Sequence, residues 1–142
     1  MTSYSPAETA EKSGFSIDTL RYYEKIGLLS DIARDAAGRR VFTDDDLAWL
    51  GMLRCLRETG MPIAEMLRYS ELTRAGEGTV AERIELLEAH DRRVEEQIER
   101  LREQQEHIRN KLALYREIAE GCPDYQAFVR RRREDTLKTA QR

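Results

Sequence analysis

The sequence has few of the residues that build disulfide frameworks and metal sites. Among its 142 residues are two cysteines, Cys55 and Cys122, and two histidines, His90 and His107. Two cysteines cannot form a disulfide framework, and in a cytosolic chain we expect both to be reduced thiols. The four residues also lack the clustered spacing of a zinc site, so we predict no metal site and no cofactor.

Long apolar runs are missing as well. No stretch approaches the about 20 apolar residues that a membrane-spanning helix needs. The segment 1–11 is polar and acidic, which is unlike a signal peptide. We therefore predict a cytoplasmic protein that makes no contact with a membrane.

The sequence also lacks the patterns that accompany catalysis. It shows no pairing of a nucleophile with a base and no glycine-rich phosphate loop. We therefore predict that the chain is not an enzyme and has no catalytic residues.

A basic excess, the usual mark of a nucleic-acid-binding protein, is absent too. The net charge is −3, and the first 75 residues carry ten Lys and Arg against twelve Asp and Glu. Any surface for DNA must therefore come from the local placement of charge.

The N-terminal third of the chain carries two short helix patterns in succession. Ser5 and Glu8 have the spacing of a capping box, and the helix they start is expected to run to about Lys12. Ser16 caps a second helix, which is expected to stop at Gly27. Two short helices joined by a glycine turn predict a helix-turn-helix.

The helical period is lost after this pair. We predict two short strands, Leu28–Leu29 and 40–42, with a polar loop between them, which together form a β-hairpin wing. Thr43 then caps a third helix that ends near Gly60, and a fourth helix begins near Pro62.

The longest regular pattern is a heptad repeat over residues 80–119, uninterrupted by glycine or proline. It predicts a coiled coil of about 40 residues, roughly 60 Å long. Asp91 and Gln105 interrupt its apolar seam. Because the N-terminal head is too small to cover the seam, we predict a homodimer. The apolar seam positions are Val80, Ile84, Leu87, Val94, Ile98, Leu101, Ile108, Leu112, Tyr115 and Ala119.

These patterns divide the chain into three parts. A helix-turn-helix head is expected over residues 1–75 and a coiled-coil helix over 76–121. A short helix from about Asp124 and a charged tail fill residues 122–142. The predicted fold is mainly α-helical: a winged helix-turn-helix head with a small β-hairpin wing, followed by a long coiled-coil helix.

The segment Arg21-Tyr22-Tyr23-Glu24-Lys25-Ile26-Gly27-Leu28-Leu29 resembles the hallmark of the MerR family of transcription regulators. The wing segment 38–42 is similar to that of the family, and 45–47 and 56–61 also fit. The resemblance covers roughly residues 4–72 in order, and the coiled coil completes it.

The resemblance implies a winged helix-turn-helix, a second wing built by the third and fourth helices, and an antiparallel coiled coil that forms a dimer. It also implies that the dimer binds promoters whose −35 and −10 elements are too widely spaced. Distortion of this spacer DNA would realign the elements for RNA polymerase, at a cost on the order of a few kcal/mol.

On this basis we predict that DNA is contacted from the second helix and from the wing. Ser16 is also a helix cap, and Arg21 has an alternative ion pair with Asp18 or Glu24. Tyr23 is expected to lie partly in the core. The predicted DNA-binding residues are Ser16, Thr19, Arg21, Tyr22, Arg39, Arg40 and Arg57.

The small number of cysteines and the short C-terminal segment exclude several classes of effector. Metal-sensing relatives carry cysteines at both ends of the dimer helix, iron–sulfur versions need four cysteines, and multidrug-binding relatives append a large ligand domain. The segment 54–57, with Cys55 between Arg54 and Arg57, resembles the AdhR/NmlR branch, which responds to aldehydes and thiol stress.

Flanking arginines favour a thiolate, so Cys55 is the candidate residue for sensing electrophiles or redox stress. The alternative for Cys55 is a small buried apolar residue. Cys122 is a second candidate thiol or simply a residue of the helix end. Two other functions stay open: a regulator with a non-thiol small-molecule effector, and a coiled-coil module that binds protein and not DNA.

Overall fold

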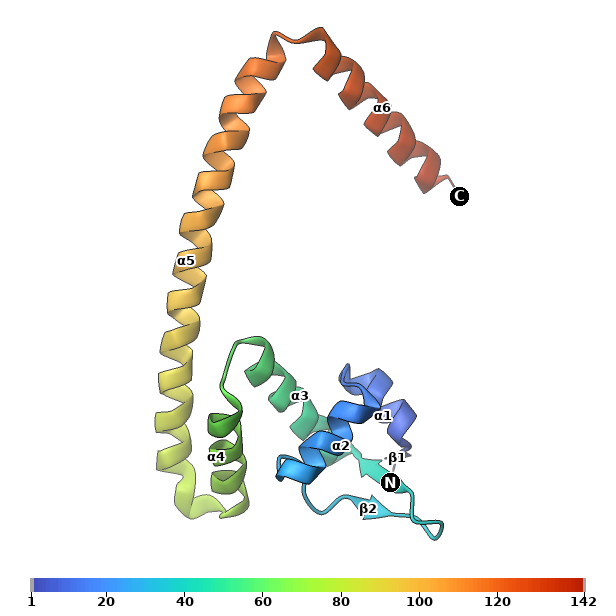
Figure 1. Cartoon of the computed structure of the whole chain (residues 1–142), viewed down its shortest axis with the longest axis vertical. Helices are drawn as coiled ribbons and strands as arrows, with labels where there is room; N and C mark the ends of the chain where they lie inside the picture. Colours follow the sequence, from blue (N-terminus) through green and yellow to red (C-terminus); the bar gives the residue numbers. More distant parts are fainter. Residues whose placement is uncertain (1, 142) are drawn as a thin grey trace. The chain divides into compact units, whose positions relative to one another are not determined.

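The computed structural model describes residues 2–141, which fold into six α-helices, a 3₁₀ turn and three short strands (Figure 1). The chain divides into two compact units, Met1–Val94 and Glu95–Arg142. In chain order the elements are β1 (Ser3–Tyr4), α1 (Pro6–Ser13), α2 (Ile17–Ile26), β2 (Ala33–Arg34), β3 (Arg40–Thr43), α3 (Asp44–Glu58), α4 (Ile63–Arg74), η1 (Glu77–Thr79), α5 (Val80–Glu120) and α6 (Pro123–Ala140).

The helix starts follow the caps expected from the sequence. Ser5 and Glu8 form a capping box on α1, and the Ser16 side chain caps α2. Thr43 and Asp46 form a second capping box on α3. These caps satisfy backbone N–H groups that a helix start leaves unpaired, and they fix where α1, α2 and α3 begin.

The sheet of the first unit has the order β1-β3-β2, and both pairings are antiparallel. Ala33 pairs with Val41 and Arg34 with Arg40, which makes the expected hairpin. The third strand, β1, was not expected, because its two residues are too few to produce a pattern. Tyr4 at its end donates a 2.7 Å hydrogen bond to Asp44 at the start of α3.

The predicted strand at Leu28–Leu29 is wrong. Both leucines lie in the turn after α2, where their N–H groups donate to the Tyr23 carbonyl at 2.9 and 3.1 Å. Their side chains are almost completely buried. Two consecutive apolar residues therefore close the core beneath the end of α2, and the hairpin strand begins later, at Ala33.

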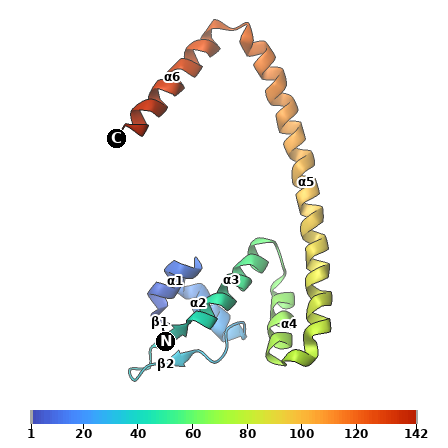
Figure 2. The ribbon, with the colours of Figure 1, turned by 180° about the vertical axis from the view of Figure 1, so that it is seen from behind.

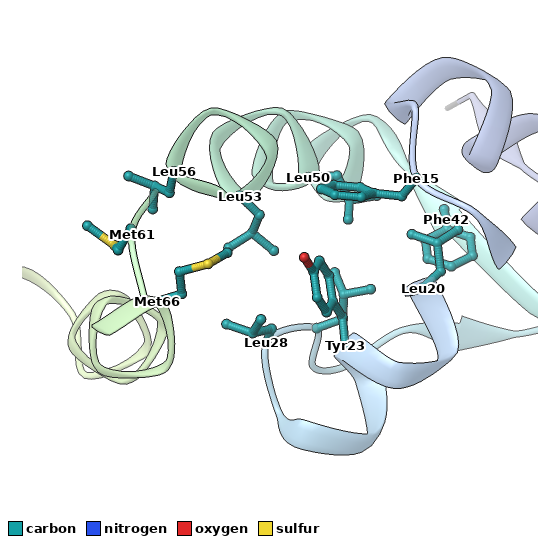
Figure 3. Packing of buried hydrophobic residues seen from close by; sticks show 11 residues of the cluster. Phe15, Leu20, Tyr23, Leu28, Phe42, Leu50, Leu53, Leu56, Met61 and Met66 are labelled. Atoms are coloured by element: carbon teal, nitrogen blue, oxygen red, sulfur yellow. The ribbon is translucent and has the colours of Figure 1, made fainter. Parts of the chain in front are cut away.

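Buried side chains from α2, β3, α3 and α4 form a single core in the first unit. Figure 3 shows Phe15 beside Leu50 of α3, with the Tyr23 ring directed toward Leu53 of the same helix. Trp49 adds a hydrogen bond to this core, because its indole Nε1 donates to the Leu28 carbonyl at 2.8 Å. This core fixes the orientation of α2, which carries the predicted DNA contacts. The core comprises Phe15, Leu20, Tyr23, Leu28, Leu29, Phe42, Leu50, Leu53, Leu56, Met61 and Met66.

α4 lies beside the beginning of α5 within the first unit (Figures 1 and 2). Leu86 and Leu87 of α5 pack against the head core. The Thr79 hydroxyl donates to the carbonyls of Leu72 and Gly76, which ties the start of α5 to the end of α4. The first turns of α5 are therefore part of the head.

In the second unit, the rest of α5 exposes its apolar seam. Leu101, Ile108, Leu112 and Tyr115 are all exposed large apolar residues in the single chain. α6 extends to Ala140, so most of the expected charged tail is helical. It contains no glycine or internal proline that would stop it earlier. No helix within residues 2–141 is long and apolar enough to cross a membrane.

Candidate nucleic-acid interface

The helix α2 has an inner and an outer face. Leu20 and Tyr23 are buried, and Tyr23 meets the Phe15 ring edge-on with 5.3 Å between centroids. Arg21 and Tyr22 point the other way, with 61% of the Arg21 side chain and 50% of Tyr22 exposed. The packing of the core therefore presents Arg21 and Tyr22 to solvent on the helix of a helix-turn-helix that would enter the major groove.

At the start of α2, Ser16 and Thr19 are engaged with each other. The Thr19 amide donates to Ser16 Oγ at 3.1 Å, and the two hydroxyl oxygens lie 2.9 Å apart. Ser16 thus serves as a helix cap, the alternative role considered from the sequence. Because both residues are at the surface of the turn, their hydroxyls can also meet a phosphate.

Arg21 lies near one acidic side chain, Asp18, with 3.8 Å between Nη1 and Oδ1. Both side chains are well exposed, and an exposed ion pair of this kind contributes about 0–1 kcal/mol. Such a weak pair leaves the Arg21 guanidinium able to exchange Asp18 for a guanine edge or a phosphate.

The wing is a tight hairpin organised by Asp35. Its carboxylate accepts from the amides of Ala37 and Arg39, each at 2.9 Å. Gly38 closes the turn at φ 80°, a backbone conformation that favours glycine. Arg39 stands at the tip with 78% of its side chain exposed and only a loose 3.6 Å pair with Asp35.

Arg40 has a different environment from that of Arg39. Its Nε donates to Glu24 on α2 at 2.9 Å, and a second wing residue, Arg34, donates to the same carboxylate at 3.1 Å. Glu24 therefore ties the wing to α2. The sequence offered no indication of this contact, because it joins residues 10 and 16 positions apart whose meeting depends on the hairpin.

We expect the two wing arginines to differ in their effect on stability. Arg40→Ala removes a partly buried ion pair and should lower the free energy of unfolding by about 1 kcal/mol. Arg39→Ala should change it by less than about 0.5 kcal/mol, because that pair is exposed. Urea unfolding of the two variants measures the difference, and an equal loss in both would contradict the role assigned to Glu24.

Arg57 and Arg54 lie on α3 and contact the helix-turn-helix. Arg57 stacks over the Phe15 ring at 5.8 Å from its centroid. Arg54 donates to Glu58 at 2.8 Å and to the Ser13 carbonyl at 3.2 Å. Its guanidinium also covers Gly14, whose φ of 78° is a backbone conformation that favours glycine.

The thiol of Cys55 is exposed on α3 and is not in a disulfide. The alternative of a buried apolar residue is therefore wrong for Cys55. Its flanking arginines both have other partners, Arg54 with Glu58 and Arg57 with Phe15. Cys122, at the start of α6, is half-buried and also unpaired with another cysteine.

A polar cluster joins the end of α3 to α5 and was not predicted. The Thr59 hydroxyl lies 2.7 Å from Nε2 of the buried His90 and donates to the Cys55 carbonyl at 2.7 Å. Arg93 makes a bidentate ion pair with Glu65 of α4. The Arg93 guanidinium holds the pKa of Glu65 below its ordinary value. Together these contacts hold both α3 and α4 on the first turns of α5.

The two family models that match the chain overlap in α3 and α4. The model described as MerR HTH family regulatory protein matches residues 4–71, and the model described as MerR, DNA binding matches residues 47–111. The first spans the helix-turn-helix and wing, and the second runs from α3 into α5. No group of three His, Cys, Asp or Glu residues that could hold a metal ion occurs within residues 2–141.

Similar proteins agree with these models. An uncharacterized HTH-type transcriptional regulator of Haemophilus influenzae is 43% identical over 114 residues, which are 80% of this chain and 84% of that protein. The HTH-type transcriptional regulator AdhR of Bacillus subtilis is 32% identical over 87 residues, which are 61% of this chain and 62% of AdhR.

Solved structures give the same result. The crystal structure of HiNmlR, a MerR family regulator lacking the sensor domain and bound to promoter DNA, is 40% identical, with a TM-score of 0.76 over 89% of this chain and 99% of that one. A putative MerR family regulator from Listeria monocytogenes is 30% identical, with a TM-score of 0.74 over 98% and 99%. The chain therefore belongs to the MerR family of helix-turn-helix regulatory proteins, in the branch that includes AdhR and HiNmlR.

Proposed function

We propose that this chain is a transcription regulator that binds promoter DNA as a homodimer and changes transcription by distorting the spacer between promoter elements. The observation that carries the proposal is the exposed Arg21–Tyr22 pair on α2, which the core turns away from the protein. HiNmlR, which this chain resembles over most of its length, is bound to promoter DNA in its crystal structure.

Two exposed arginines supply local positive charge for DNA, although the net charge of the chain is −3. Arg21 lies on the outer face of α2, and Arg39 stands at the tip of the wing. A helix in the major groove and a wing on the adjacent backbone would use these two charges differently. Arg21 would contact base edges or phosphate, and Arg39 would contact phosphate alone. Ser16, Thr19, Tyr22, Arg40 and Arg57 remain predicted contacts.

The dimer is supported by the exposed seam of α5. Leu101 and Ile108 each leave more than half of their area exposed in the single chain. Large exposed apolar side chains at heptad spacing are covered in a coiled coil by a second helix. A dimer would present two α2 helices to two half-sites and so could bend the DNA between them for RNA polymerase.

A gel-shift assay on the chain's own promoter, at about 0.15 M salt, tests DNA binding. We expect a specific complex with the stoichiometry of two chains per operator. A footprint with enhanced cleavage in the spacer would support distortion. Binding no tighter than to unrelated DNA would contradict the proposal and would favour a coiled-coil module that binds protein.

We further propose that the regulator responds to electrophiles or thiol stress through Cys55. The thiol is exposed, so a small aldehyde or quinone can reach it. It also lies one turn before Thr59, whose hydroxyl bonds both the Cys55 carbonyl and the buried His90 of α5. A covalent adduct on this turn would therefore act next to the contact between α3 and α5.

Cys55→Ser is expected to remove the electrophile-dependent change in transcription while leaving DNA binding without electrophile unchanged. Serine keeps the size of the side chain but lacks the nucleophilic thiolate. The measurement is promoter output with and without a small aldehyde, together with mass spectrometry of the treated protein. Cys122→Ser is the matched control and should respond normally. A full response in both Cys55→Ser and Cys122→Ser would contradict the role of Cys55 and would favour a non-thiol small-molecule effector.

A further inference from the structure

A buried histidine lies where the end of α3 meets α5. Only 6% of His90 is exposed, and both of its ring nitrogens have polar neighbours. Nε2 lies 2.7 Å from the Thr59 hydroxyl oxygen, and Nδ1 lies 3.4 Å from Nη2 of Arg93. Which ring nitrogen carries the hydrogen decides the direction of both hydrogen bonds. Neither the DNA contacts nor the thiol of the proposed function accounts for a buried histidine at this place.

The neighbouring arginine selects the tautomer of His90. A guanidinium has no acceptor, so Arg93 can only donate to Nδ1. Nδ1 must therefore present a lone pair, which it has neither in the Nδ1–H tautomer nor in the imidazolium. The bidentate pair with Glu65 of α4 holds the guanidinium in place, and Nη2 has two hydrogens, one for Glu65 and one for Nδ1. The geometry thus favours a neutral His90 with its hydrogen on Nε2.

The hydrogen on Nε2 sets the direction of the bonds at Thr59. When Nε2 donates, the Thr59 oxygen accepts from His90, and the Thr59 hydrogen points to the Cys55 carbonyl at 2.7 Å. The resulting hydrogen-bond chain runs in one direction from Arg93 through His90 and Thr59 to Cys55. Hydrogen bonds in such a chain polarise one another, so a change at one end alters the others. The chain connects α5 to the last turn of α3.

The thiol of Cys55 lies next to this chain on the outside of α3. Residues four apart share a face of a helix, with about 5–6 Å between their Cβ atoms, so Cys55 and Thr59 are neighbours. Cys55 is exposed, and Thr59 is the C-cap residue of α3. The last turn of a helix is held by fewer backbone hydrogen bonds than its interior. A bulky group on the thiol would therefore displace Thr59 more readily than a residue in the middle of α3.

We propose that His90, as its Nε2–H tautomer, is the positioning residue that couples the Cys55 turn of α3 to α4 and α5. The inference rests on the thiol response of the proposed function and adds the route by which an adduct acts on the dimer helix. An adduct that displaces Thr59 breaks the hydrogen bond from Nε2, and the imidazole and the Arg93 guanidinium then move together. Because Arg93 also holds Glu65, the displacement reaches α4 as well as α5.

NMR of the isotope-labelled full-length chain measures the tautomer. In proton–nitrogen correlation spectra, a ring nitrogen with a lone pair resonates well apart from one that carries a hydrogen. At neutral pH we expect two widely separated nitrogens for His90, with the lone pair on Nδ1. His107, the other histidine of the chain, is exposed on α5 and should show values averaged over its protonation states. An Nδ1–H tautomer or an imidazolium at His90 would overturn the proposal.

Alkylation of Cys55 tests the coupling. In a Cys122→Ser background, N-ethylmaleimide can label one thiol per chain, and mass spectrometry verifies complete labelling. The thiolate adds to the maleimide double bond and the neighbouring carbon takes up a proton, so no group leaves. We expect the ring resonances of His90 to shift and those of His107 to stay. Thr59→Val keeps the shape of the side chain without its hydroxyl, and the shift of His90 should then be lost.

Thr73→Val is the matched control for Thr59→Val. The Thr73 hydroxyl donates at 2.9 Å to the Tyr69 carbonyl one turn earlier in α4, the same kind of bond that Thr59 makes to Cys55. This variant should show the wild-type shift, and Thr59→Ser, which keeps a hydroxyl, should restore it. A His90 that does not shift in the fully alkylated wild type would overturn the coupling. So would a full shift in Thr59→Val.

Transcription measured with the same alkylated samples separates the two ways of failing. If His90 shifts and promoter output stays unchanged, the thiol response of the proposed function is wrong and the coupling stands. If promoter output changes and His90 does not shift, the coupling is wrong and the thiol response stands. A Cys55 thiol that does not react with the maleimide would contradict both, because no adduct would then form beside Thr59.

Discussion

Ile108→Glu is expected to leave the chain monomeric and to abolish tight binding to promoter DNA. Ile108 lies on the seam of α5, is 62% exposed in the single chain, and borders an apolar groove with Ile98 and Leu101. In a twofold dimer one substitution introduces two buried carboxylates, each without a partner. Burying an unpaired charge costs several kcal/mol, which a seam of this length cannot offset.

Loss of the dimer should have a larger effect on DNA binding than the loss of any single DNA contact. A dimer binds its second half-site as an intramolecular step, and such coupling raises affinity by roughly 10²–10⁴-fold. A monomeric variant should therefore bind the operator weaker by about that factor. Sedimentation or light scattering gives the mass, and a gel shift at the same salt concentration gives the affinity.

Asn110→Glu provides the matched control for this experiment. It adds the same charge two residues away, on the polar face formed with Glu103, Glu106 and His107. We expect a dimer with nearly unchanged affinity. If Ile108→Glu were still dimeric at the concentration where the wild type is dimeric, the seam would not be the dimer interface.

Local features of the fold could be predicted because they depend on a few neighbouring residues. The Ser5–Glu8 capping box and the caps at Ser16 and Thr43 are each set by side chains within three positions of the backbone they bind. The starts of α1, α2 and α3 followed from them. The long helix followed from its unbroken heptads.

Features that depend on tertiary packing could not be predicted in the same way. Leu28 and Leu29 suit a strand by composition, but their burial beneath the end of α2 holds them in a turn. The ion pairs of Glu24 with Arg34 and Arg40 form only after the two strands of the hairpin have paired in their observed register. A lone acidic residue in the sequence gives no indication of such a contact.

The predicted site residues were placed unequally by the structure. Arg21, Tyr22 and Arg39 stand exposed, as a DNA contact requires. Arg40 and Arg57 have partners within the protein, at Glu24 and Phe15. Sequence alone could not separate these two groups, because arginine is equally suited to a contact within the protein and to a contact with phosphate.

Arg21 gives the sharpest test of the recognition helix. Its only ion pair among the described residues is the loose 3.8 Å contact with Asp18, so removing it should change the free energy of unfolding by less than about 0.5 kcal/mol. If Arg21 contacts a guanine edge, Arg21→Ala should weaken specific binding by about 1–3 kcal/mol per half-site, because a bidentate pair is lost. The discrimination between operator and unrelated DNA should fall with it.

The comparison that isolates this effect uses Arg100→Ala, which removes the same charge from the exposed side of α5. Any uniform electrostatic effect of losing one positive charge appears in both variants and in their salt dependence. A base contact by Arg21 adds a loss that is specific to the operator sequence and unaffected by salt. Equal affinities for the operator in the two variants would show that Arg21 does not bind DNA, and recognition would then depend on Tyr22 and the wing.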